Sequence, residues 1–389
     1  MLKLLARRFI KDYQHKDDPV VRLRYGALAG ITGICLNALL AVCKLIGGAL
    51  TRSVAVTADA LNNLGDAASS LVTLVGFRMA GKKADREHPF GHGRTEYIAG
   101  LIVAMLILVM GVELLISSVK KIITPEPAVF SWLTAGILMA AILVKLYMFV
   151  YNRGIGKAIA SSAMRATALD SLSDMVATGA VLLSMFLSRW TGLMLDGWAG
   201  ALVALFILYT GFCAVKETIG PLLGAPPSEA LMAQISQIVL GEPVVVGMHD
   251  LMVHDYGPGR VIVTLHAEVP ADGDILEMHD AVDNLEKHLQ ATLGCTAVIH
   301  MDPVVTGDEK TDRYREIVHS IARDIDPRFT IHDFRYVPGT THTNLVFDVV
   351  VPFGLEMSDE AVKAAICARV RALEGQYYAV VEIDKSYVG

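Results

Sequence analysis

The chain has little of what enzymes and secreted proteins depend on. Its five cysteines form no CxxC pair and no disulfide framework, which fits a reducing compartment. Its formal net charge of −6 gives no indication of nucleic-acid binding. No nucleophile–base arrangement and no glycine-rich phosphate loop is evident. We therefore expect a protein that is not an enzyme, holds no prosthetic group and has no nucleic-acid partner.

Charged residues are also scarce, at 19% of the chain, whereas 53% of its 389 residues are hydrophobic. The apolar runs are confined to residues 27–215, and residues 216–389 read as a soluble segment. A membrane-spanning helix needs roughly 20 apolar residues. The sequence predicts a cytoplasmic N-terminal segment over 1–26 and a transmembrane domain over 27–216. The six predicted transmembrane helices are 27–49, 54–77, 97–118, 131–151, 168–188 and 192–215.

The distribution of lysine and arginine predicts the orientation. The N-terminal segment and the loops after the second and fourth spans carry fifteen of these residues, and the opposite side carries four. Because cytoplasmic loops are enriched in Lys and Arg, both termini are expected in the cytoplasm. The first 26 residues have no small-residue cleavage site and do not read as a signal peptide. We expect a multi-pass protein of the cell (inner) membrane.

Two predicted spans carry paired polar residues four positions apart. Asn62 and Asp66 lie in the second span, and Asp170 and Asp174 lie in the fifth. Residues at i and i+4 share one face of a helix, and carboxylates at membrane depth indicate a functional site. If the two helices face each other, one amide and three carboxylates surround a cation. Oxygen ligands suit Mg²⁺, Ca²⁺ or Mn²⁺, whereas imidazole favours zinc. The alternative is that these residues only join helices through hydrogen bonds.

A second group of ligand-type residues lies in the loop "ADREHPFGHGRTEY". Asp85, His88 and His92 follow one another within eight residues, beside two glycines and a proline. Three such side chains at this spacing are able to close on one metal ion. The alternative is a solvated turn with incidental histidines.

The soluble tail reads as the same αββαβ unit twice, over 217–304 and 311–389, with a polar linker at 303–312. Each unit has a His-Asp pair, an alternating strand that ends in Val-Pro, a helix and a final strand, at an offset of about 82 residues. This pattern predicts a small α+β domain, apparently duplicated, with helices on one face of the sheet.

The first tail unit is rich in ligands that we expect to converge on one or two metal ions: His249, His266, His279, His300 and Asp302. The matching positions of the second unit hold fewer and harder ligands: His332, Asp348, Glu382 and Asp384. We interpret the second unit as a degenerate copy kept for packing or dimerisation.

Over about residues 10–304 the sequence resembles the cation diffusion facilitator family of divalent-metal transporters. The segments that carry the resemblance are "SVAVTADALNNLGDAASS", "HPFGHGRTEYIAGL", "ALDSLSDMVATGAVLLS", "DGWAGALVALFILYTG" and "VIHMDP". The resemblance implies six spans followed by a metallochaperone-like cytoplasmic domain. It implies a transport site at Asn62, Asp66, Asp170 and Asp174 and a loop site at Asp85, His88 and His92. It also implies a cytoplasmic site that bridges a homodimer at His249, His266, His279, His300 and Asp302.

The sequence departs from the zinc members of that family, which typically carry a histidine in span two or five. Asn62 and Asp170 stand there instead. All-oxygen quartets are associated with manganese in the family, in agreement with the ligand-hardness argument. We expect Mn²⁺ as the substrate, with Zn²⁺ or a similar ion at the cytoplasmic sites. A zinc or iron exporter, a metal-sensing membrane scaffold with little flux, and a passive channel are the alternatives.

Ligand chemistry also predicts the coupling. Clustered aspartates in a low dielectric hold protons when no metal is bound, and metal binding requires deprotonated ligands. Export of the cation is then exchanged for inward protons by alternating access. The expected partners are divalent cations, protons, the lipid bilayer and a second copy of the chain, which pairs through the tail. Metal bridging in that dimer is a hypothesis for sensing cytoplasmic metal.

Overall fold

The computed structural model describes residues 7–8, 10–15, 18–51, 54–124, 131–191 and 196–386. The chain forms two compact units. The first comprises Met1–Ala225 with Asp255–Arg260, and the second comprises Pro226–His254 with Val261–Gly389. Each has its own hydrophobic core.

The first unit is helical. Its long helices are α2 (Pro19–Thr51), α3 (Val54–Ala80), α4 (Thr95–Ile123), α5 (Trp132–Ala158), α6 (Ser162–Thr191) and α7 (Asp196–Leu223). Among the described residues, five helical segments are long and apolar enough to cross a membrane: Pro19–Ile46, Thr95–Ile123, Trp132–Ala158, Ser162–Ser184 and Gly197–Leu223. These correspond to the first, third, fourth, fifth and sixth predicted spans. The second predicted span falls on α3, whose 27 residues extend about 40 Å, more than the roughly 30 Å of a bilayer core.

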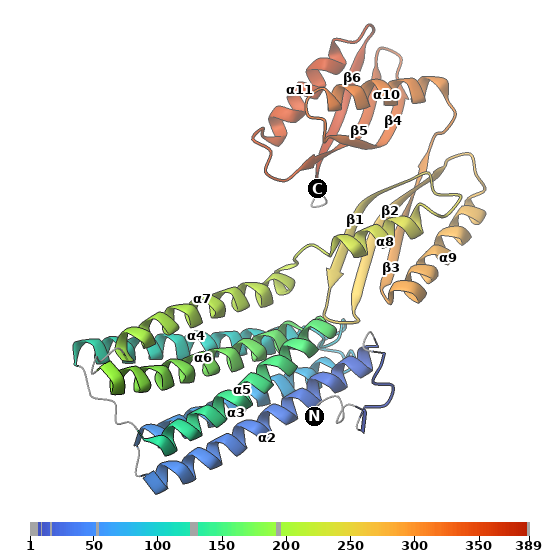
Figure 1. Cartoon of the computed structure of the whole chain (residues 1–389). Coiled ribbons are helices and arrows are strands. Elements are labelled where there is room, and N and C mark those ends of the chain that lie inside the picture. Colours follow the sequence, from blue (N-terminus) through green and yellow to red (C-terminus); the bar gives the residue numbers. More distant parts are fainter. Residues whose placement is uncertain are drawn as a thin grey trace. The chain divides into compact units, whose positions relative to one another are not determined.

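The helices of this unit lie alongside one another, with α2 against α3, α4 against α7 and α5 against α6 (Figure 1). Small residues allow the closest approach. A Cβ added at Gly30 of α2 would lie 2.9 Å from the Cβ of Leu74 on α3, and one at Gly33 would lie 2.7 Å from the Oγ of Ser70. Helices in lipid are held by such packing and by hydrogen bonds rather than by the hydrophobic effect. One of these bonds, 2.9 Å between the hydroxyls of Thr73 and Thr167, joins α3 to α6.

The second unit begins with α8 (Glu229–Val239), β1 (Gly247–Asp255), β2 (Val261–Pro270), α9 (Ile275–Leu293) and β3 (Thr296–Val304), here called the first tail domain. Its strands are ordered β1-β2-β3, and β2 and β3 run parallel because α9 crosses between them. Asp274 caps α9 by accepting hydrogen bonds from the backbone N–H groups of Leu276 and Glu277.

The second tail domain repeats this order with α10 (Glu309–Arg323), β4 (Thr330–Pro338), β5 (Thr343–Pro352), α11 (Asp359–Arg371) and β6 (Tyr377–Ser386). Its strands are ordered β4-β5-β6, and β5 and β6 are again parallel. The predicted linker is shorter than expected, since β3 ends at Val304 and α10 begins at Glu309.

Burial alternates along the central strand of each tail domain, so each sheet has one face covered by helices and one face without helices, here called the open face. Buried and half-buried residues alternate along both β2 and β5. The buried set packs under the helices, as predicted from the sequence, and forms the two cores of this unit. The half-buried set, which includes His266 on β2 and Asp348 on β5, lies on the face without helices. Ligand-type residues therefore collect on the open faces.

Candidate functional site

The paired polar residues of the second and fifth predicted spans lie on α3 and α6, which contact each other. The structure brings Asp66 of α3 together with Asp170 and Asp174 of α6, with one oxygen of each within 4.8 Å of the others. All three are buried. We call them the carboxylate cluster. Asn62, the fourth predicted ligand, lies one turn before Asp66 on α3, and its side chain is outside the described residues. The predicted convergence of the two helices is thus present for the three carboxylates.

A lysine that the sequence analysis did not single out lies within this cluster. Lys145 of α5 donates hydrogen bonds to Oδ2 of Asp66 at 2.7 Å and to Oδ2 of Asp174 at 2.5 Å. Its side chain is only 4% exposed. The sequence did hold a signal, because Lys145 is the one charged residue in the apolar run "WLTAGILMAAILVKLYMFVYN", and charged residues inside a membrane mark functional sites.

The cluster keeps unused ligand capacity. Asp170 Oδ1 is buried and has no hydrogen-bond partner among the described residues. A buried acceptor without a partner is costly, and a bound cation relieves that cost. The donor set of three carboxylates fits a hard divalent ion. Chemically the cluster is able to hold either a metal ion or protons, beside the ammonium of Lys145.

A separate buried ion pair fixes α2 against α4. Arg22 donates to both carboxylate oxygens of Glu96, at 2.5 and 2.8 Å, and its Nε donates to the carbonyl of Ile159. The Glu96 side chain is fully buried. We counted Arg22 only as part of the positive N-terminal segment, so its structural role was missed. The bidentate geometry gives this pair a role in holding the helices rather than in binding a cation.

The loop between α3 and α4 gathers the predicted residues Asp85, His88 and His92, here called the loop cluster. Asp85 Oδ2 lies 3.4 Å from His92 Nε2, and Asp85 Oδ1 lies 3.5 Å from His88 Nδ1. Asp85 also accepts hydrogen bonds from the Lys82 ammonium and from the His88 backbone N–H, which hold the pKa of its carboxyl well below the usual range. The Nδ1 atom of the buried His92 has no hydrogen-bond partner among the described residues. The three side chains fit one metal ion.

The first tail domain brings His249, His266 and Asp302 together, and we call these the first tail cluster. Asp302 Oδ2 lies 2.8 Å from His266 Nδ1 and 3.2 Å from His249 Nε2. Burial lowers the pKa of His249, so this imidazole is neutral near pH 7, as metal ligation requires. The parallel register of β2 and β3 pairs His266 with His300, whose Nε2 lies 3.3 Å from Asp302 Oδ1. His279, the fifth predicted residue, lies exposed on α9 and is not brought into this cluster.

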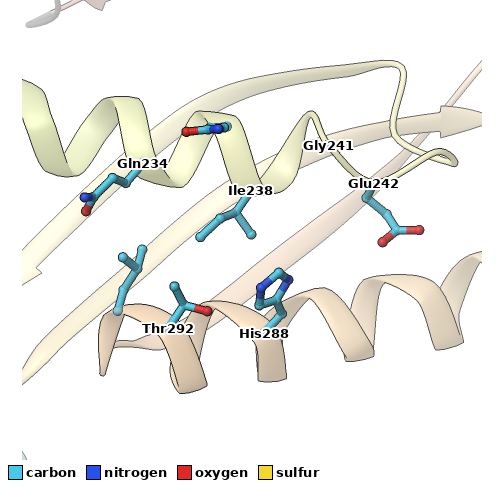
Figure 2. Close-up of a pocket in the computed structure, with 8 residues that line it drawn as sticks. Gln234, Ile238, Gly241, Glu242, His288 and Thr292 are labelled. Carbon is cyan, nitrogen blue, oxygen red and sulfur yellow. The ribbon is translucent and has the colours of Figure 1, made fainter.

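A shallow groove between α8 and α9 is a further concave feature of the first tail domain (Figure 2). Figure 2 shows that it is lined by Gln234, Ile238, Gly241, Glu242, His288 and Thr292. It contains a single histidine and a single carboxylate, and it lies among the helices rather than on the open face of the sheet. The candidate metal ligands of this domain therefore lie on its strands and not in this groove.

Comparison with known proteins gives consistent matches. Residues 30–223 match the cation efflux transmembrane domain, and residues 227–304 match the cytoplasmic domain of cation efflux proteins. An uncharacterized transporter of Methanocaldococcus jannaschii is 30% identical over 275 residues, which cover 70% of this chain and 97% of that protein. The cation-efflux pump FieF of Salmonella typhimurium is 30% identical over 283 residues, which cover 72% and 94%. The chain therefore belongs to the cation efflux family of membrane transporters, the cation diffusion facilitators, with a transmembrane domain and a cytoplasmic domain.

Proposed function

We propose that this transporter exports divalent cations from the cytoplasm in exchange for protons, with Mn²⁺ as the favoured substrate. The observation that carries the proposal is the buried cluster of three carboxylates on α3 and α6, with no nitrogen or sulfur ligand among its described members. Oxygen ligands suit Mn²⁺ better than Zn²⁺. Asn62 completes the site in this proposal.

The charge of the cluster supports proton exchange. Three carboxylates and the Lys145 ammonium leave two negative charges in excess, and a divalent cation balances them. When the cation leaves, the same buried charges are uncompensated, which is costly in a low dielectric. Two protons restore neutrality. Exchange of one divalent cation for two protons is thus the stoichiometry that keeps the site neutral in both states.

We further propose that α3 also crosses the membrane, which brings the number of transmembrane helices to six. In this proposal the membrane is the inner membrane, and both termini lie in the cytoplasm. The support is the length of α3 and the excess of Lys and Arg on the predicted cytoplasmic side. In this arrangement the loop cluster and the tail are on the side from which the substrate enters. The loop cluster binds the arriving ion, and the tail pairs two copies of the chain, with His279 as part of the dimer site.

We also interpret the second tail domain as an internal duplicate of the first. The two have the same order of helices and strands, and their landmark residues are about 82 positions apart. The matched family domain ends at residue 304, so this duplicate lies outside it.

A second candidate keeps the transport and changes the substrate to Zn²⁺ or Fe²⁺. It is favoured by the imidazoles of the loop cluster and the first tail cluster, which are softer ligands than carboxylates. A metal-sensing scaffold with little flux is the candidate from another class, and it needs only the cytoplasmic clusters.

Vesicles that contain the purified protein separate these candidates. With a proton gradient imposed, we expect Mn²⁺ flux to exceed Zn²⁺ and Fe²⁺ flux and to vanish in Asp174→Asn. Asp170→His should shift selectivity towards Zn²⁺, because it adds an imidazole. Glu113→Gln is the matched control, since Glu113 is an exposed acid on α4. Flux that does not depend on the proton gradient would refute proton exchange. A preference for Zn²⁺ in the unaltered protein would refute the manganese assignment. No flux of any ion would favour the metal-sensing scaffold.

A further inference from the structure

The two tail domains contact each other through their His-Asp pairs. The rings of His249 and His332 are stacked, with centroids 4.3 Å apart. The backbone N–H of Asp333 lies 3.4 Å from the Glu268 carboxylate that accepts its hydrogen bond. Asp250 and Asp333, the second residues of the two pairs, both adopt the left-handed conformation, with φ of 51° and 49°. This conformation is uncommon outside glycine. The same left-handed residue therefore occurs in the first strand of both domains, β1 and β4, and lies where the domains meet.

A second group of ligand-type side chains gathers at this contact. Asp250 comes from the first tail domain, and His332 and Asp384 come from the second. One ligand atom of each lies within 4.8 Å of the others. We call these residues the junction cluster. They share no residue with the first tail cluster, although His332 stacks on His249 of that cluster.

His332 is the member that points to a ligand. Its side chain is 9% exposed, and neither ring nitrogen has a hydrogen-bond partner among the described residues. Its Nε2 lies 3.0 Å from Asp384 Oδ2, out of line for a hydrogen bond. A histidine kept only for packing normally pairs at least one ring nitrogen, because a buried polar atom without a partner lowers the stability of the fold. A cation between the imidazole and the two carboxylates satisfies the ring and balances the charge.

We propose that Asp250, His332 and Asp384 bind a divalent transition-metal cation that joins the two tail domains of one chain. The second tail domain is then a metal-binding partner of the first, rather than the degenerate copy predicted from the sequence. Binding at this site does not depend on whether the membrane domain exchanges protons for metal.

Strand register shows how the ligand set differs from that of the first tail cluster. Asp384 of β6 stands where β3 has Asp302, and His332 stands where β1 has His249. The place of His266 is taken by Asp348, which the antiparallel register of β4 and β5 sets beside His332. One imidazole among carboxylates is a harder ligand set than two imidazoles with one carboxylate. The junction site is therefore more tolerant of Mn²⁺ than the first tail cluster, while it still accepts Zn²⁺ and Co²⁺.

The test counts Zn²⁺ ions bound to the purified full-length protein after dialysis at fixed free Zn²⁺. His332→Ala and Asp384→Asn should each lose one ion per chain. Asp250→Asn should lose the same ion without disturbing the backbone of β1, since asparagine tolerates positive φ. His266→Ala should remove a different ion, so that the loss in His266→Ala/His332→Ala is the sum of the two. His342→Ala, an exposed histidine of the second tail domain, is the matched control and should keep the full count.

A second measurement reports the joining of the domains. Residues 305–308 of the linker are exposed, and a metal ion that holds the domains together should slow proteolysis there. We expect Zn²⁺ to protect the unaltered protein and the His342→Ala variant but not His332→Ala, with metal-free melting temperatures that match. Full Zn²⁺ counts in His332→Ala and Asp384→Asn would overturn the site. A full count in Asp250→Asn, or equal protection of His332→Ala, would overturn the joining of the two domains.

Discussion

Replacement of Lys145 by methionine tests the carboxylate cluster most directly. Methionine keeps the length and apolar stem of the side chain and removes its charge. In the unaltered protein, the Lys145 ammonium is 4% exposed and bonds to both Asp66 and Asp174, so it occupies part of the space and charge that an incoming cation needs. Lys145→Met removes this internal competitor. We therefore expect the variant to bind Mn²⁺ more tightly and to release it more slowly.

The size of the effect follows from the buried ion pairs. Removal of one partner of a buried pair costs about 3–5 kcal/mol, because the other charge is left uncompensated. In Lys145→Met that cost falls on the metal-free state, and a bound cation relieves it. The lower value corresponds to about 100-fold in the dissociation constant for Mn²⁺ at 1.4 kcal/mol per tenfold. The gain should shrink as the pH falls, because protons then neutralise the unpaired carboxylates instead.

Two measurements on the purified protein check this expectation. Equilibrium binding of Mn²⁺ at several pH values gives the change in affinity. Thermal unfolding with and without Mn²⁺ should show a less stable metal-free variant but a larger stabilisation by metal, since ligand binding stabilises the folded state in proportion to RT ln(1 + [L]/Kd). Lys157→Met, an exposed lysine in the last turn of α5, is the matched control and should change neither quantity.

Unchanged or weaker Mn²⁺ binding in Lys145→Met would refute the competition. Such a result would mean that Lys145 holds the aspartates in place for the metal instead of standing in for it. Tighter binding that does not depend on pH would refute the second half of the reasoning, in which protons and the lysine compensate the same charges.

Two further predictions concern groups outside the carboxylate cluster. Glu96→Gln should lower the stability of the membrane unit by about 3 kcal/mol, since it leaves the buried Arg22 guanidinium unpaired; a melting temperature in detergent equal to that of the unaltered protein would contradict this role. Lys82→Met should raise the pKa of Asp85, because the Lys82 ammonium is the main cause of its low value. As the pH is lowered, protons should then displace metal from the loop cluster of Lys82→Met at a higher pH than in the unaltered protein. If the pH dependence of Co²⁺ binding is the same in the two proteins, Lys82 has no such effect.

The helical period alone predicted that Asp170 and Asp174 share one face of a helix, and the family resemblance implied that Asp66 joins them. Which third helix faces the cluster is a matter of packing between distant segments, and for that reason Lys145 was missed. The role of Arg22 was missed for the same reason. In the sequence it reads as one of the positive residues of the N-terminal segment, whereas in the structure it forms a buried ion pair with Glu96. Charge counts along the chain do not distinguish these two environments.

The tail shows a similar division between local and distant information. Alternation in β2 and β5 and the repeated landmarks predicted both sheets and helices on one face of each. The structure adds that the ligand-type residues lie on the other face. The comparison of the two units also identified His332 and Asp384 as counterparts of His249 and Asp302. Asp250 was not predicted as a ligand, because its role depends on how one tail domain packs on the other. His279 was predicted with the first tail cluster but lies apart from it within one chain, so a role for it in the dimer remains a prediction.

The clusters also differ in what a metal ion must displace. In the carboxylate cluster and the loop cluster a lysine ammonium, Lys145 or Lys82, already bonds to the carboxylate ligands. In the first tail and junction clusters no lysine or arginine bonds to the described ligands, and buried imidazole nitrogens of His249 and His332 have no hydrogen-bond partner there. A metal ion in the tail therefore shares the described ligands with no ammonium group, whereas a cation in the carboxylate cluster must share Asp66 and Asp174 with Lys145. Under the proposed function, this difference suits tail clusters that fill at low metal and a carboxylate cluster that fills only at higher metal and that protons help to empty.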